Sequence, residues 1–147
     1  MIIPWLKTID FIHENTYDEV NRIKVDTRLM RPVHNISKEC REKIVTLLLE
    51  KRSKSELARE LGISPASIVK FYKGKTHASD ITIERAINVA DKEERTRIME
   101  LILDDLVESL LSLLSDHQDI NSEKLELLKR VLEEREKRKV LASLGLV

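Results

Sequence analysis

The feature that most constrains the fold of this chain is the stretch from Ser53 to Gly74, SKSELARELGISPASIVKFYKG. Ser53 and the glutamate three residues later form a capping-box pattern, which starts a helix. Ser64 is a second helix cap, and the proline after it stands at a first helical position, where its missing N–H costs nothing. Gly62 lies between the two helices, at a position suited to the positive φ that glycine tolerates. The stretch therefore predicts two short helices joined by a tight turn.

Apolar residues recur at helical spacing along most of the remaining chain. They predict a helix over residues 38–51 capped by Ser37, and a last helix capped by Asn121 or Ser122. Further helices are expected over residues 4–14, 17–24, 81–90 and 92–115. The segment VDTRLMRPVHN, residues 25–35, is expected to be a connector, because a proline disfavours helical backbone at the residue before it.

The charges of the chain cancel overall but are unevenly distributed. The full sequence has 26 Lys and Arg against 26 Asp and Glu. Residues 51–77 contain seven Lys and Arg but only two Glu, whereas residues 91–119 contain three Lys and Arg and nine Asp and Glu. A basic patch beside an acidic one is typical of a nucleic-acid binder that keeps a separate, non-binding face. A solvated surface that merely mixes both charges gives the same pattern, so charge alone leaves the two interpretations open.

Packing two helices across a glycine turn leaves one face of the second helix pointing outward. Leu57, Leu61 and Ile68 have the spacing of buried residues in such a unit. The residues expected to face outward are Ser64, Pro65, Ala66, Ser67, Lys70 and Lys73, with Lys54, Lys75, Thr76 and His77 at the flanks. Short side chains at a helix N-terminus permit close approach to base edges, and lysines suit phosphates. We therefore interpret these residues as a candidate surface for double-stranded DNA.

SKSELARELGISPASIVKFYKGK resembles the helix-turn-helix of Cro/repressor-like regulators, whose pattern is T-Q-x-x-L-A-x-x-L-G-V-S-x-x-x-I-S-x-x-x-x-G. The residues that match are Leu57, Ala58, Leu61, Gly62, Ser64, Ile68 and Gly74. Lys54 stands where that family often has a glutamine. Residues 42–72 are also similar to the DNA-binding helices of Hin-type invertases and transposases. The resemblance covers residues 38–91 and implies sequence-specific DNA binding, as a transcriptional regulator or as the DNA-binding module of a mobile-element recombination protein.

The expected fold is all-α and has three regions. Residues 1–36 form an N-terminal helical arm, residues 37–91 the Cro/repressor-like helix-turn-helix domain, and residues 92–147 a C-terminal helical hairpin for oligomerisation or interaction. Four leucines within residues 110–114 make an apolar surface wider than the small central domain can cover. We expect the C-terminal helices to pair with a second copy, giving a homodimer with two recognition helices. Periodicity alone leaves open a hairpin closed within one chain.

Catalytic and metal-binding patterns do not stand out in the sequence. The histidines at positions 13, 34, 77 and 117 lack the spacing of metal ligands, and Cys40 is interpreted as a small apolar side chain. Asp104 and Asp105 are interpreted as solvated acids. Tyr72 falls inside the predicted helix-turn-helix, which argues against a nucleophilic tyrosine. We expect no enzyme activity, no cofactor and no metal site.

Two further expectations concern location and partners. No apolar run is long enough to span a membrane and no signal-peptide pattern opens the chain, so a cytoplasmic protein without membrane contact is expected. A different class of function, an antitoxin-like or adaptor domain that binds another protein, stays open. The leucine-rich C-terminal half favours that class, whereas the caps and glycines of residues 53–74 favour DNA.

Overall fold

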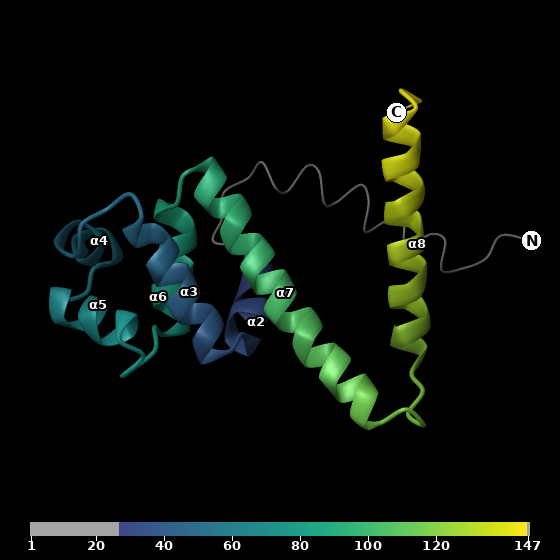
Figure 1. Ribbon diagram of the computed structural model, residues 1–147, viewed down its shortest axis with the longest axis horizontal. Helices are drawn as coiled ribbons and strands as arrows, with labels where there is room; N and C mark the ends of the chain where they lie inside the picture. The colour runs from purple at the N-terminus through teal and green to yellow at the C-terminus, as the bar shows by residue number, and fades with distance from the viewer. Residues whose placement is uncertain (1–26, 147) are drawn as a thin grey trace, which may run out of the picture. The chain divides into compact units, whose positions relative to one another are not determined.

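The computed structural model describes the backbone of residues 27–146 and the side chains of residues 31–146. All regular elements in this part of the chain are α-helices, as the sequence predicts. They are α2 (Thr27–Asn35), α3 (Lys38–Leu49), α4 (Lys54–Leu61), α5 (Pro65–Tyr72), α6 (Asp80–Val89), α7 (Lys92–Asp116) and α8 (Glu123–Ser143) (Figure 1). The helices predicted at residues 4–14 and 17–24 lie outside the described residues.

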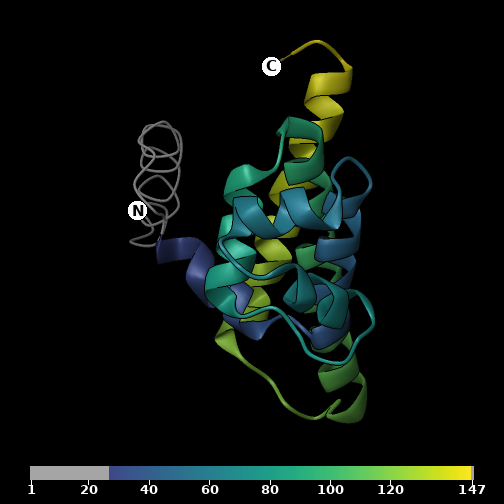
Figure 2. The same ribbon diagram turned by 90° about the vertical axis from the view of Figure 1, so that its left-hand side faces the viewer.

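Two compact units divide the chain after Val107. The first contains α2 to α6 and the beginning of α7, and the second contains the end of α7 and all of α8. Helices α4 and α5 pack side by side at one end of the first unit (Figures 1 and 2). The segment singled out by its caps and glycines is therefore an exposed end of this unit.

One apolar core holds the helices of the first unit together. Its fully buried members include Ile44, Leu48, Leu57, Leu61, Ile68, Ile83 and Ile98. These side chains come from each of the helices α3 to α7, so that every one of these helices is anchored in the same core. Burying a leucine or isoleucine contributes about 1.5–3 kcal/mol, which makes this shared core the main source of cohesion.

Serine side chains cap most of the helices at their N-termini. The capping residues are Ser37, Ser53, Ser64, Ser79 and Ser122. The predicted capping box is confirmed, because the Ser53 hydroxyl accepts from the Glu56 N–H at 3.2 Å and the Glu56 carboxylate accepts from the Ser53 N–H at 2.8 Å. Ser122 rather than Asn121 caps α8.

The prediction of a connector over residues 25–35 is wrong, because this segment contains α2 with Pro32 inside it. A proline removes one helical hydrogen bond, so other contacts have to compensate. Val33 is fully buried, and its carbonyl accepts from the Arg41 guanidinium at 2.7 Å. Ile36, just after the helix, is also buried. Packing against the rest of the unit therefore outweighs the local effect of the proline.

A glycine turn joins α4 to α5. Gly62 ends α4 with a φ of 66°, and its N–H donates to the Ala58 carbonyl. Arg85 of α6 fixes the same turn, because its Nη1 donates to the Leu61 carbonyl at 2.9 Å. A Cβ added at Gly62 would lie 3.0 Å from that Nη1. Gly74 takes the same φ of 66° after α5.

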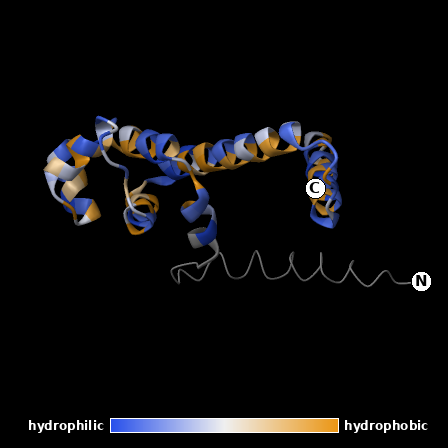
Figure 3. Ribbon diagram, turned by 90° about the horizontal axis from the view of Figure 1, so that it is seen from below, coloured by the Kyte–Doolittle hydropathy of each residue, from blue (hydrophilic) through white to orange (hydrophobic). Residues whose placement is uncertain are grey.

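The second unit leaves its apolar side chains exposed. Helix α8 buries none of its residues, and both hydrophobic and hydrophilic colours appear in its ribbon, which Figure 3 shows end-on. Leu132 is 54% exposed and Leu144 is 66% exposed. No helix of the described residues has the length and hydropathy required to cross a membrane.

Candidate nucleic-acid interface

The N-terminal turn of α5 is held outward by a cap at its start and an anchor behind it. The Ser64 hydroxyl accepts from the Ser67 N–H at 3.2 Å and lies 2.9 Å from the Ser67 hydroxyl. Ile68, one residue later, is fully buried in the core. Pro65 and Ala66 are consequently exposed, with small side chains that leave the helix end accessible. Ser67 is half-buried, and its hydroxyl forms a hydrogen bond with that of the capping residue Ser64.

The predicted lysines lie around this helix end and beyond it. Lys70 is on α5, and Lys73 and Lys75 follow the helix with Thr76. All four residues are exposed, and none of the three lysines forms an ion pair within residues 27–146. The structure thus keeps the predicted positions on the outside of the first unit.

Lys54, at the start of α4, contacts the aromatic ring of Tyr72 at the end of α5. Its Nζ lies 5.2 Å from the centre of the Tyr72 ring, within the range of a cation–π interaction. Tyr72 is 48% exposed, so the pair stands at the surface. The sequence analysis gave Tyr72 no binding role, because it is eighteen positions from Lys54 and nothing in the sequence indicates that α4 and α5 bring the two side chains together.

Lys51, another basic residue of the segment 51–77, is neutralised by acidic residues. The Lys51 ammonium lies 2.8 Å from Asp91 and 3.1 Å from Glu93. These bonds raise the pKa of Lys51, and the Lys51 ammonium lowers the pKa of Asp91. Lys51 is therefore unsuited to bind an external anion, and the count of seven basic residues overstates the charge that is free.

Arg52 is the centre of a polar network rather than a surface charge. Its guanidinium donates to both oxygens of Glu94, at 2.6 and 3.1 Å, and to Glu60 at 2.7 Å. It also donates to the carbonyls of Leu48 and Val89. The Glu94 side chain is 1% exposed, and the bond from Arg52 lowers the pKa of Glu94. One arginine thus ties α4 to α3, α6 and α7.

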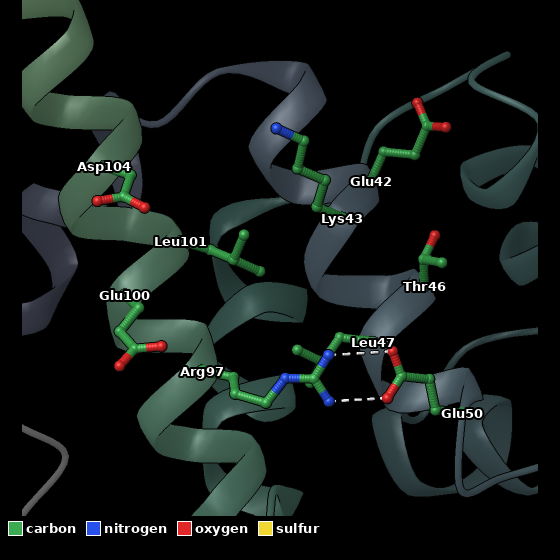
Figure 4. A pocket seen from close by; sticks show the side chains of 9 residues that line it. All are labelled: Glu42, Lys43, Thr46, Leu47, Glu50, Arg97, Glu100, Leu101 and Asp104. Atoms are coloured by element: carbon green, nitrogen blue, oxygen red, sulfur yellow. Dashed lines mark hydrogen bonds and ion pairs between the residues drawn. The ribbon is translucent and has the colours of Figure 1, made fainter.

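A groove of about 520 Å³ lies between α3 and α7 in the first unit (Figure 4). Arg97 forms a two-bond pair with Glu50 across it, at 2.7 and 3.2 Å. This pair lowers the pKa of Glu50 and raises that of Arg97. Glu42, Glu100 and Asp104 also line the groove, which makes it acidic and poorly suited to a nucleic acid.

The interpretation of Asp104 and Asp105 as a pair of solvated acids is wrong for Asp105. That residue is half-buried, and its carboxylate accepts from the Ser37 N–H at 2.8 Å and from the Ser37 hydroxyl. Because Ser37 caps α3, Asp105 of α7 reinforces the start of α3. The sequence could not reveal this, since the two residues are 68 positions apart.

Cys40 and the acidic residues do not form a chemical site. The Cys40 thiol is buried, and burial followed by the charge of Asp105 raises its pKa to about 11, which keeps it protonated. No group of His, Cys, Asp and Glu side chains in the described part of the chain could hold a metal ion.

The chain matches no protein-family model, and no curated protein or solved structure is detectably similar to it.

Proposed function

We propose that this chain binds double-stranded DNA sequence-specifically, with α4, the Gly62 turn and α5 acting as a helix-turn-helix and α5 as the recognition helix. The sorting of charge supports this most directly. Lys70, Lys73 and Lys75 have no carboxylate partner among the described residues, while nearby Lys51 is paired. A DNA backbone would supply the missing counter-charges.

The proposed contacts follow from where the side chains lie. Pro65 and Ala66 leave the α5 N-terminus open to base edges, and the helix dipole adds an attraction for phosphate. Lys70 is exposed one helical turn after Ala66, which places it on the same face of α5. The residues proposed to contact the DNA backbone are Lys54, Lys73, Lys75 and Thr76, with Ser64 and Ser67 at the helix end. Tyr72 restricts Lys54 to one side of α4, which favours a defined contact.

The proposed role is that of a dimeric transcriptional regulator in the cytoplasm, held as a homodimer by its C-terminal helices. Two copies would present two recognition helices to a pseudo-palindromic site. A DNA-binding module of a mobile-element recombination protein would use the same contacts. Enrichment of bound sites from a random duplex library separates these roles, since an inverted repeat favours the dimeric regulator.

The DNA surface is tested by reversing two of its free charges. Lys70→Glu with Lys73→Glu should weaken binding to a selected duplex about 100-fold or more, and should flatten the salt dependence by about 2 in the log–log slope. The matched control is Lys38→Glu with Lys124→Glu. It makes the same change in net charge at exposed first-turn positions of α3 and α8, where glutamate suits the helix dipole.

Equal loss of affinity in both double variants would show that net charge alone drives binding and that α5 is not the reading helix. Retained affinity in the Lys70 and Lys73 variant would refute the assignment directly. Circular dichroism of each variant checks that helicity is unchanged, because all four substituted side chains are exposed.

One observation favours a second candidate, a domain that binds another protein. Helix α8 buries none of its side chains, and its exposed apolar residues suit a helical partner. An antitoxin-like or adaptor protein would present such a surface. In the library selection, this candidate is supported by the absence of any enriched duplex.

A further inference from the structure

Helix α7 has a second apolar face besides the one that packs in the core. Ile98 and Ile102 are buried in the core of the first unit. On an adjoining side of the helix, the spacing alternates strictly between four and three residues, as in a coiled-coil seam. We call this set the outer stripe, and it consists of Met99, Leu103, Leu106, Leu110 and Leu113.

The outer stripe is still accessible in the single chain. Leu103 is 50% exposed and Leu113 is 56% exposed, and Leu110 is half-buried. Met99 and Leu106 are half-buried because they also pack against the core of the first unit, so that they offer only part of their surface to a partner. A groove of about 520 Å³ runs along its beginning, where Met99 and Leu103 lie beside Glu100. Val107 and Leu111 widen the apolar surface next to the stripe and are also exposed. An apolar surface of this length is typical of a helix that packs against another helix.

Helix α8 carries a seam that matches the outer stripe in the antiparallel direction. Core positions of an antiparallel pair require one constant register along both helices. A single register places three pairs of leucines opposite one another: Leu113 with Leu125, Leu110 with Leu128, and Leu106 with Leu132. The same register continues with Leu103 opposite Arg135 and Met99 opposite Lys139.

The charges of the two helices agree with this direction. Residues 98–119 contain six Asp and Glu and no Lys or Arg, whereas residues 135–139 contain four Lys and Arg and one Glu. The antiparallel register brings the basic end of α8 to the part of α7 that carries Glu100 and Asp104. Pairing α7 with α7 of another copy would instead face two acidic helices, which is unfavourable. The only described ion pair of Lys139 is a 3.9 Å contact with Glu136, and both side chains are exposed.

The number of apolar faces on α8 indicates that the partner is a second copy. None of the α8 residues is buried within the single chain. Besides the seam of Leu125, Leu128 and Leu132, α8 exposes Val140 and Leu141 on a different side of the helix. One neighbouring helix covers only a stripe of about 100°. Two faces require two neighbours, and a bundle of α7 and α8 from two copies supplies them.

We propose that α8 of one copy packs antiparallel on the outer stripe of α7 of a second copy, and that this exchange is reciprocal. The inference deepens the homodimer of the proposed function by naming the paired surfaces. It stands on packing and charge alone, so that it can be tested without DNA.

Charge exchange between two chains gives a test that a closed single chain cannot pass. One chain carries Glu100→Lys with Asp104→Lys, which makes its α7 basic like its α8. The other carries Arg135→Glu with Lys139→Glu, which makes its α8 acidic like its α7. All four side chains are exposed, and helicity by circular dichroism should be preserved.

Sedimentation equilibrium should show a dimer for the wild-type chain. Each variant alone should dissociate with a dimer constant about 100-fold weaker, because like charges then face each other in both halves. Mixing the two variants should restore the dimer, since both halves of the mixed pair then join opposite charges. The inference is overturned if the wild-type chain is a monomer, if either variant stays dimeric, or if the mixture remains dissociated.

A second measurement covers the case in which a variant is unstable. Chains with single substitutions Leu110→Cys and Leu128→Cys, carrying tags of different mass, should form a mixed disulfide when combined. Ser112→Cys, in place of Leu110→Cys, is the control away from the stripe and should not cross-link. A chain that carries both Leu110→Cys and Leu128→Cys and forms a disulfide only within itself would refute the exchange.

A dimer without DNA affinity refutes the proposed function alone, and a monomer that binds the selected duplex refutes only this inference.

Discussion

Removal of the Arg52 guanidinium is expected to destabilise the first unit strongly. In Arg52→Leu, the Glu94 carboxylate keeps the bond from the Asp91 N–H at 2.9 Å but loses both bonds from the guanidinium. Its side chain is 1% exposed, so water cannot replace the lost partner. Breaking a buried pair by removing one member costs about 3–5 kcal/mol. Since Arg52 itself is 15% exposed, we expect about 3 kcal/mol, a large part of the stability of an ordinary domain.

Urea unfolding followed by far-UV circular dichroism measures this loss. The matched control is Arg97→Leu, which breaks the pair with Glu50, where the two side chains are 44% and 50% exposed. Because solvent screens that pair, its loss should shift the midpoint far less. Replacing both Arg52 and Glu94 by leucine should restore part of the stability lost in Arg52→Leu, since no unpaired carboxylate then remains.

The pH dependence gives an independent check on the cause. Arg52 lowers the pKa of Glu94 below its unfolded value, so the pair stabilises the fold fully above that unfolded value and loses its effect as pH falls through the folded value. The difference in stability between the wild type and Arg52→Leu should therefore be largest above the unfolded pKa of a glutamate, and it should shrink as pH falls below that value through the lowered folded-state pKa of Glu94. An equal effect of the two arginine substitutions at neutral pH, or a difference that does not change with pH, would refute the reasoning.

One further substitution and one chemical modification test the structure of the first unit. Gly62→Ala should lower the free energy of unfolding in urea by about 1–2 kcal/mol, because alanine is strained at a φ of 66° and its Cβ would contact Arg85 closely. An unchanged urea midpoint would show that the turn adapts to alanine without loss of stability. The Cys40 thiol should react very slowly with iodoacetamide at neutral pH in the folded protein and rapidly in urea. The reason is that the thiol is buried in the folded protein and its pKa is raised to about 11. Rapid alkylation of the native chain would show that α3 separates from the core readily.

Local signals made the helices predictable. The caps at Ser37, Ser53 and Ser64 depend on hydrogen bonds to residues three positions away, so the sequence alone contains them. The all-α fold and the turn at Gly62 follow from the same short-range rules. The exposure of Pro65 agrees with the predicted outward face of α5. That this face reads DNA stays a prediction.

Contacts between distant residues could not be predicted in the same way. Arg52 and Glu94 are 42 positions apart, and the sequence offers several other acids as partners. The helix around Pro32 forms because Val33 is buried by segments far along the chain, against the local preference of a proline. The partners of Lys54 and Asp105 depend likewise on how the helices pack, which periodicity does not specify.

The bond between Asp105 and Ser37 bears on where this protein can be cut or recombined. A gene fragment that stops at Asp91, where the predicted helix-turn-helix domain ends, would omit Ile98 from the core, Glu94 from Arg52 and the carboxylate that secures the start of α3. The shortest autonomous product would have to include residues as far as Leu106. Any exchange of C-terminal halves between chains of this kind would have to join them within α7, beyond that point.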